Sequence, residues 1–103
     1  SDLDEGTRKK IRRGQMLVEI LKQSDGAPLG FEKQTVIFYA ALKGYFDGVE
    51  IDKIRETEAK YLEYMERIHE KDILSSIQES GDLTPEVEEK LKKGIEAFLQ
   101  TLQ

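Results

Sequence analysis

Apolar residues recur at every third or fourth position along most of the 103-residue chain. This spacing places them on one face of a helix, and no stretch alternates apolar and polar residues for long enough to indicate a strand. The pattern therefore predicts an all-α fold, a small bundle of about five helices in a single domain spanning residues 1–103. The expected helices cover residues 4–21, 32–46, 52–69, 71–81 and 85–102.

The first two expected helices differ in how their apolar residues are distributed. The first is amphipathic, with inward positions at Ile11, Leu17, Ile20 and Leu21 and outward positions at Arg8, Lys9, Lys10, Arg12 and Arg13. The second contains the run "VIFYAAL" (36–42) and is apolar on most faces, so it is expected at the centre of the bundle. Because that run is far shorter than the roughly 20 residues that span a bilayer, no direct membrane insertion is expected.

The third expected helix carries an apolar stripe and a charged face. The stripe consists of Ile54, Tyr61, Leu62, Met65 and Ile68. The charged face interleaves carboxylates with basic side chains: Glu56, Glu58, Glu63 and Glu66 with Lys53, Arg55, Lys60 and Arg67. Spacings of three and four favour a solvated surface of weak ion pairs. The alternative is a pair of carboxylates that performs acid/base chemistry.

Glycine, threonine and proline mark the ends of the last two helices. Gly81 is expected to form a left-handed C-terminal cap, and Thr84 is expected to cap a helix that begins with Pro85. Gly94 lies inside that last helix. There it costs about 1 kcal/mol relative to alanine, unless a neighbouring helix needs the close approach.

Composition excludes several kinds of active site. The sequence has no cysteine and a single histidine, His69, so it contains neither a zinc-cysteine site nor a serine triad. It also lacks the glycine motifs that hold nucleotide phosphates. We therefore expect no catalytic residue and no metal site in this chain. A lone histidine at a helix end is typical of a surface residue or of a partner for the helix dipole.

Charge argues against nucleic-acid binding as a general function. Sixteen basic and 21 acidic residues give a net charge of -5, whereas phosphate contacts need a basic face. The basic cluster "RKKIRR" (8–13) is the exception. We interpret it as a local charge patch against an acidic neighbour. The alternative, a phosphate-binding surface, predicts steeply salt-dependent binding to DNA or RNA.

Four stretches of the sequence, taken in order, resemble the C-terminal domain of the alpha subunit of F-type ATP synthases. They are "SDLDEGTRKKIRRGQMLVEILKQ", "APLGFEKQTVIFYAALKGYFD", "IDKIRETEAKYLEYMERIH" and "GDLTPEVEEKLKKGIEAFLQ". The resemblance covers essentially the whole chain and keeps the order and spacing of the segments. It implies that the barrel and nucleotide-binding domains of a longer subunit precede Ser1 and are absent from this chain.

The resemblance implies a role within a larger machine. The domain would belong to the non-catalytic, regulatory alpha subunit of a rotary ATP synthase, which couples ion flow to ATP synthesis or hydrolysis. Its expected partners are the beta subunit, the gamma subunit of the central stalk and the peripheral stalk. Its expected location is the soluble sector at the cytoplasmic face of a bacterial plasma membrane, or at the equivalent organellar membrane. ATP or ADP with magnesium would bind the full-length subunit, whereas this fragment would hold no cofactor and catalyse no reaction.

The resemblance also implies a nucleotide contact after the first helix. In the alpha family a "KQGQ" stretch at this position directs glutamine side chains toward the adenine of the non-catalytic nucleotide. Gln23 matches the first glutamine, and Asp25 stands where the second is expected. An ionised carboxylate only accepts hydrogen bonds, so Asp25 keeps half of the pairing at best. We expect Gln23 to end a helix with its amide pointing outward.

A second implied site is the turn "DGVEID" (47–52). By resemblance it occupies the place of the acidic, rotor-contacting motif of the beta partner, which makes Asp47, Gly48, Glu50 and Asp52 candidate rotor-facing residues. The alternative is a solvated turn without a partner. For the molecule as a whole, the competing hypothesis is a stand-alone helical protein-interaction module without an ATPase role.

Overall fold

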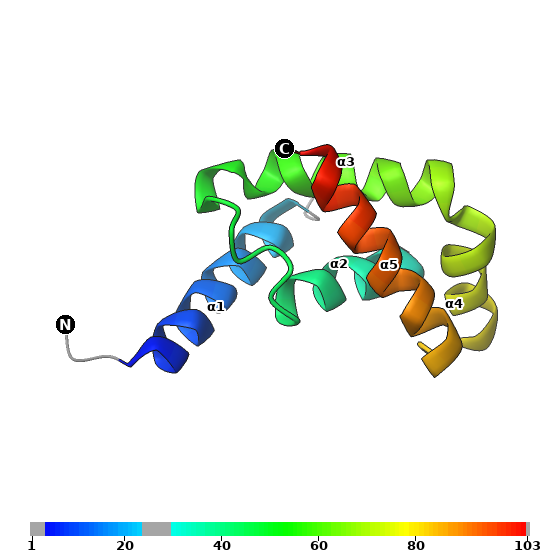
Figure 1. Cartoon of the computed structure of the whole chain (residues 1–103), viewed down its shortest axis with the longest axis horizontal. Helices are drawn as coiled ribbons and strands as arrows, with labels where there is room; N and C mark the ends of the chain where they lie inside the picture. The colour runs from blue at the N-terminus through cyan, green and yellow to red at the C-terminus, as the bar shows by residue number, and fades with distance from the viewer. Residues whose placement is uncertain (1–3, 24–29, 103) are drawn as a thin grey trace.

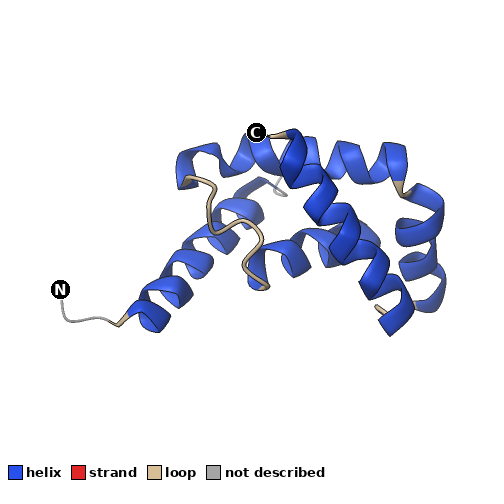
Figure 2. Cartoon of the chain, viewed as in Figure 1, coloured by secondary structure: helices blue, strands red, loops and turns tan. Residues whose placement is uncertain are grey.

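The computed structural model describes residues 4–23 and 30–102, and these form an all-α domain without strands. The helices are α1 (Glu5–Gln23), α2 (Phe31–Leu42), the 3-10 turn η1 (Ile51–Lys53), α3 (Ile54–Ile68), the π-helical turn η2 (Glu70–Leu74), α4 (Ser75–Ser80) and α5 (Pro85–Thr101). The predicted fold class, a bundle of five α-helices, is confirmed (Figure 2). None of the described helices combines the length and the apolar character needed to cross a membrane.

The helices pack around α2, and α1 reaches out from the bundle at its N-terminal end (Figure 1). α3 packs against α1 and α2, and α5 contacts both α3 and the η2 turn. The domain measures 45 × 31 × 28 Å. Five of the twelve residues of α2 are buried, Val36, Ile37, Tyr39, Ala40 and Ala41, so its predicted central place is confirmed.

Tyr61 of α3 joins the helices in the middle of the core. Its ring is fully buried and meets Phe46 edge-on at a centroid distance of 5.4 Å and Phe98 of α5 at 5.3 Å. Its hydroxyl donates a hydrogen bond of 2.9 Å to the carbonyl oxygen of Val36 in α2. One side chain therefore links α2, α3, α5 and the segment that follows α2.

The predicted helix caps and the close approach at Gly94 are confirmed. Gly81 has a φ of +70° at the end of α4, and the Thr84 hydroxyl accepts a hydrogen bond from the amide of Val87 at 3.3 Å. A Cβ atom on Gly94 would lie 3.1 Å from Nε2 of His69, so this glycine lets α5 approach the end of α3. The His69 side chain is only 18% exposed and lies 3.2 Å from the Asp72 carboxylate.

The second and fourth helices end or begin differently from the prediction. α2 stops at Leu42 instead of residue 46, because Gly44 has a φ of +88°, which a helix cannot contain. The segment expected as one helix over 71–81 begins as a π-helical turn at Glu70 and becomes regular only at Ser75. Hydrophobic spacing does not distinguish a π turn from the first turn of an α-helix.

Several residues predicted to face inward are exposed. They are Ile11 (48%), Leu21 (56%) and Ile68 (53%). In α1 the residue buried instead is Met16, which lies one helical turn from Ile20 on the face that packs against α3. The inward face of α1 is therefore rotated from the predicted one, because the run of apolar residues around this helix is wide enough to permit several faces.

Candidate functional site

The turn after α2 carries the candidate rotor-facing residues and is fixed to α1 by two arginines. The Arg13 guanidinium binds both carboxylate oxygens of Asp47, with Nε to Oδ1 at 3.1 Å and Nη2 to Oδ2 at 2.8 Å. Its neighbour Arg12 donates from Nη2 to the carbonyl oxygen of Val49 at 2.7 Å. Two adjacent residues of α1 thus hold two points of the turn.

This geometry changes the predicted role of the two arginines. Both were expected to face outward, yet both are only half-exposed because their side chains lie against the turn. For Arg13 the acidic neighbour expected of the basic cluster is Asp47, 34 residues along the chain. The hydrogen bond from Arg13 lowers the pKa of Asp47 below its ordinary value, and the same bond raises the pKa of Arg13. Both groups are therefore charged at neutral pH.

We call the Arg13–Asp47 ion pair the tether. It separates the four candidate residues of the turn into one that is paired and three that are exposed. Asp47 is half-buried and neutralised by Arg13, whereas Gly48, Glu50 and Asp52 are exposed. Gly44, three residues before Asp47, lies so close to the Arg13 guanidinium that a Cβ atom there would clash with it. The arrangement presents two carboxylates, Glu50 and Asp52, on a turn that is held in place by α1. It offers electrostatic contact with a partner and no nucleophile or proton relay.

The tether can be tested by a double-mutant cycle. Arg13→Ala and Asp47→Ala are each expected to lower the free energy of unfolding, and the pair to show a favourable coupling, since the ion pair is bidentate although partly solvated. Because the folded pKa of Asp47 is depressed, this contribution is present at neutral pH and is lost as the pH falls through the folded value. Urea unfolding at pH 7 and pH 3 measures both effects. Additive single effects at pH 7 would contradict the tether.

The described residues include only part of the predicted nucleotide contact. α1 is described as far as Gln23, and the next six residues lie outside the described part of the structure, so the expectation that Gln23 ends a helix stays a prediction. The outward orientation of its amide stays a prediction, because its side chain lies outside the described part of the structure. Asp25 also lies outside the described residues, as do its neighbours from 24 to 29. Within residues 4–23 and 30–102 no group of three or more histidines or carboxylates is arranged to hold a metal ion.

Glu58 is a buried carboxyl group that the sequence pattern failed to identify. It was assigned to the solvated face of α3, but its side chain is 3% exposed and neither oxygen has a hydrogen-bond partner among the described residues. Loss of hydration raises its pKa from 4.5 to about 7. The signal lay in its spacing, because Ile54, Glu58, Tyr61 and Met65 follow one another at intervals of four, three and four.

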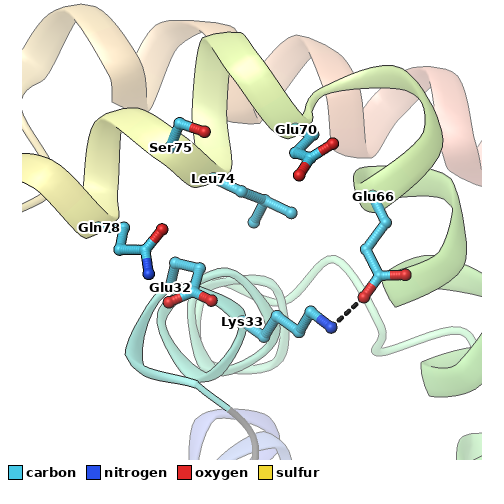
Figure 3. A pocket seen from close by; sticks show the side chains of 7 residues that line it. All are labelled: Glu32, Lys33, Glu66, Glu70, Leu74, Ser75 and Gln78. Carbon is cyan, nitrogen blue, oxygen red and sulfur yellow. Dashed lines mark ion pairs between the residues drawn. The ribbon is translucent and has the colours of Figure 1, made fainter.

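An acidic groove lies where the start of α2 meets the end of α3 and the helices that follow. Figure 3 shows Leu74 at its centre, with Glu32, Glu70 and the Lys33–Glu66 ion pair around it. The groove has a volume of about 320 Å³, and Ser75 and Gln78 complete its wall. Its carboxylates are partly neutralised by Lys33 and open to solvent, so it does not form a closed binding pocket.

Comparison with known proteins gives consistent matches. The family model described as "ATP synthase alpha/beta chain, C terminal domain" matches residues 1–98. The ATP synthase subunit alpha of Shewanella loihica is 41% identical over 101 residues, 98% of this chain and 20% of that protein. The ATP synthase subunit alpha of Desulforudis audaxviator is 40% identical over 100 residues, 97% of this chain and 20% of that protein. The sequence thus spans about one fifth of the length of these relatives.

Proposed function

The protein belongs to the family formed by the C-terminal domains of ATP synthase alpha and beta subunits, and on that premise we propose that it acts as the helical, non-catalytic end domain of an alpha subunit in a rotary ATP synthase. Its matches to two alpha subunits at about 40% identity support the alpha assignment. The match over residues 1–98 is the observation that carries the proposal. No observation favours the competing hypothesis of a stand-alone interaction module.

In this role the domain packs in a ring of alpha and beta subunits around the central stalk, at the soluble sector of a membrane-bound complex. The tethered turn faces the rotor, where Glu50 and Asp52 contact it and Asp47 holds the turn in position through Arg13. Contacts between exposed charges are worth less than about 1 kcal/mol each. Such contacts suit a surface against which a rotor must turn without being trapped. The gamma subunit is the proposed partner of this turn.

The nucleotide contribution of the domain is limited to the adenine edge. Gln23 and Asp25 would contact the base, whereas the ATP or ADP phosphates and magnesium would be held by the preceding domain of the full-length subunit. The match of Gln23 to the first glutamine of the family's "KQGQ" stretch supports this contact. The proposed location is the cytoplasmic face of a bacterial plasma membrane or the equivalent organellar membrane.

A transplant tests the proposed function. Residues 1–98 replace the matching segment of the Shewanella loihica alpha subunit, and the chimeric subunit is assembled with the other subunits of that enzyme. We expect a complex that assembles and couples ATP hydrolysis to proton pumping in membrane vesicles. A chimera that is produced and folded but does not enter the complex would overturn the proposal.

Variants of the same chimera test the turn. Glu50→Gln combined with Asp52→Asn is expected to reduce ATP-driven proton pumping while leaving assembly intact, because both side chains are exposed. The matched control removes the same charge from α5, as Glu89→Gln with Glu96→Gln, two residues that are also exposed. Equal effects of the two double variants would show that the turn has no special role, without touching the alpha-subunit assignment.

A further inference from the structure

The buried carboxyl group of Glu58 lies where α3 packs against α1. Arg55, three residues earlier on α3, lies 3.8 Å from Glu19 of α1, and Ile54, four residues earlier, is fully buried. Because residues three and four apart are neighbours on a helix surface, Glu58 lies beside both of them. Its carboxyl group is therefore between the hydrophobic core and the edge of the α1–α3 contact.

This contact offers little to compensate a negative charge. The face of α1 that packs against α3 buries Met16 and Ile20, which are both apolar. Glu19 is a second carboxylate, and its own partner is Lys22 at 3.1 Å. Neither oxygen of Glu58 receives a hydrogen bond from a described residue. The ionised form of Glu58 thus lacks the partners that a buried charge needs.

The other elements that pack against α3 supply no partner either. Their charged side chains include Asp52 and Lys53 of η1, which are exposed, Lys33 of α2, which pairs with Glu66, and Asp72 of η2, which lies beside His69. α5 approaches α3 through Phe98, and its Glu88 accepts a hydrogen bond from Tyr39. Among the described charged groups, Arg55 is the one that opposes the rise in the pKa of Glu58.

α1 is the element whose movement would hydrate Glu58 at the smallest cost. Of the described side chains of α1 only Met16 and Ile20 are buried, whereas α5 buries five residues. Figure 1 shows α1 reaching out from the bundle. Elements with few buried contacts open locally at a lower free energy than the whole domain unfolds. Ionisation of Glu58 is therefore expected to act first on the α1–α3 contact.

We infer that the α1–α3 contact is a proton-controlled latch, closed while Glu58 carries its proton and opened locally, by movement of α1 away from α3, when Glu58 is ionised. Arg12 and Arg13 lie on α1 and hold the turn after α2, so opening of the latch also loosens that turn. The inference concerns contacts within the domain and does not depend on what the turn faces. It can therefore fail while the proposed function holds, and the reverse is also true.

Native-state hydrogen exchange of the 103-residue protein tests the latch. Amide protection factors, from which the intrinsic pH dependence of exchange is divided out, are measured at pH 6 and pH 8 in several low concentrations of urea. Protection of residues 16–22 is expected to fall about tenfold between these pH values, because the carboxyl is protonated until about pH 7 only while the contact is closed. This protection should depend little on urea, since a local opening exposes little surface, whereas protection of α5 should fall steeply with urea.

Variants assign the pH dependence to Glu58. Glu58→Gln is expected to reduce the change in α1 protection between pH 6 and pH 8 to less than about twofold, because the side chain no longer ionises. Glu63→Gln removes an exposed carboxylate from the same helix and should keep the tenfold change. The amide of Val49, which donates to the Phe46 carbonyl within the turn, should follow α1 in the parent protein.

Three results would overturn the latch. They are protection of α1 that is the same at both pH values, an equal change in the parent and in Glu58→Gln, and a dependence on urea as steep in α1 as in α5 at both pH values. The last result would mean that the proton acts on unfolding of the whole domain. Unchanged protection at Val49 while α1 opens would overturn the link between the latch and the turn.

Discussion

Replacing Glu58 by glutamine is expected to make the domain more stable at pH 8, by up to about 3 kcal/mol in the free energy of unfolding. The parent protein must bury a carboxylate at that pH, and neither oxygen of Glu58 receives a hydrogen bond from any described residue. Glutamine has nearly the same shape and remains neutral at every pH. The substitution therefore removes a buried charge without leaving a cavity.

The direction of the pH dependence follows from the two pKa values. In the unfolded state the Glu58 carboxyl loses its proton near pH 4.5, whereas in the folded domain it keeps the proton until about pH 7. Between these values the folded state binds more protons than the unfolded state, so stability falls as the pH rises. The loss is complete above pH 7. Arg55, a neighbour on α3, favours the charged form of Glu58 and so offsets part of this rise in pKa. Arg55 is itself exposed and lies 3.8 Å from Glu19, which weakens its effect.

Urea unfolding at pH 5, 6, 7 and 8 measures this effect. The control is Glu63→Gln, which removes a carboxylate from an exposed position of the same helix and is expected to change stability by less than about 0.5 kcal/mol. A carboxyl carbon NMR titration of the parent protein should give a midpoint near 7 for Glu58. An ordinary midpoint, with parallel pH curves for the parent and Glu58→Gln, would show that this carboxyl is hydrated.

Glu58 also shows which part of the fold the sequence could and could not predict. The number and order of the helices followed from apolar spacing, and the caps at Gly81 and Thr84 followed from residue type. These features depend on contacts within a few residues. Whether Glu58 faces water depends on which helices cover α3, and local charge spacing gave the wrong answer because ion-pair spacing and core spacing are both three and four.

Prediction of the candidate site from the sequence was limited in the same way. The acidic turn was identified from its composition and by resemblance, but its attachment to α1 was not. Arg13 and Asp47 are 34 residues apart, and no local pattern pairs a particular arginine of "RKKIRR" with a particular carboxylate. The exposed faces of α1 were misassigned for the related reason that a helix with apolar residues on two sides does not say which side is covered within the domain. Ile11 and Leu21 are on the uncovered side.

Tyr61→Ala is expected to lower the free energy of unfolding by about 3–5 kcal/mol, a large share of the roughly 5–15 kcal/mol typical of a domain. The substitution empties a fully buried site and removes the ring contacts with Phe46 and Phe98. Tyr61→Phe keeps the ring and loses only the hydrogen bond to the Val36 carbonyl, so its expected cost is about 1 kcal/mol. Urea unfolding separates the two variants.

The same substitution should loosen the proposed rotor-facing turn. Phe46 immediately precedes Asp47, so the ring of Tyr61 holds the start of the turn from the core side while Arg13 holds it from α1. Amide hydrogen exchange at residues 46–50 is therefore expected to speed up more in Tyr61→Ala than in Tyr64→Ala. Tyr64 is half-buried on the same helix, and its ring meets those of Phe98 and His69 but has no ring contact with Phe46 among the described residues. Equal exchange in the two variants, at matched global stability, would mean that the arginines of α1 alone position the turn, and that the core contributes stability without setting its geometry.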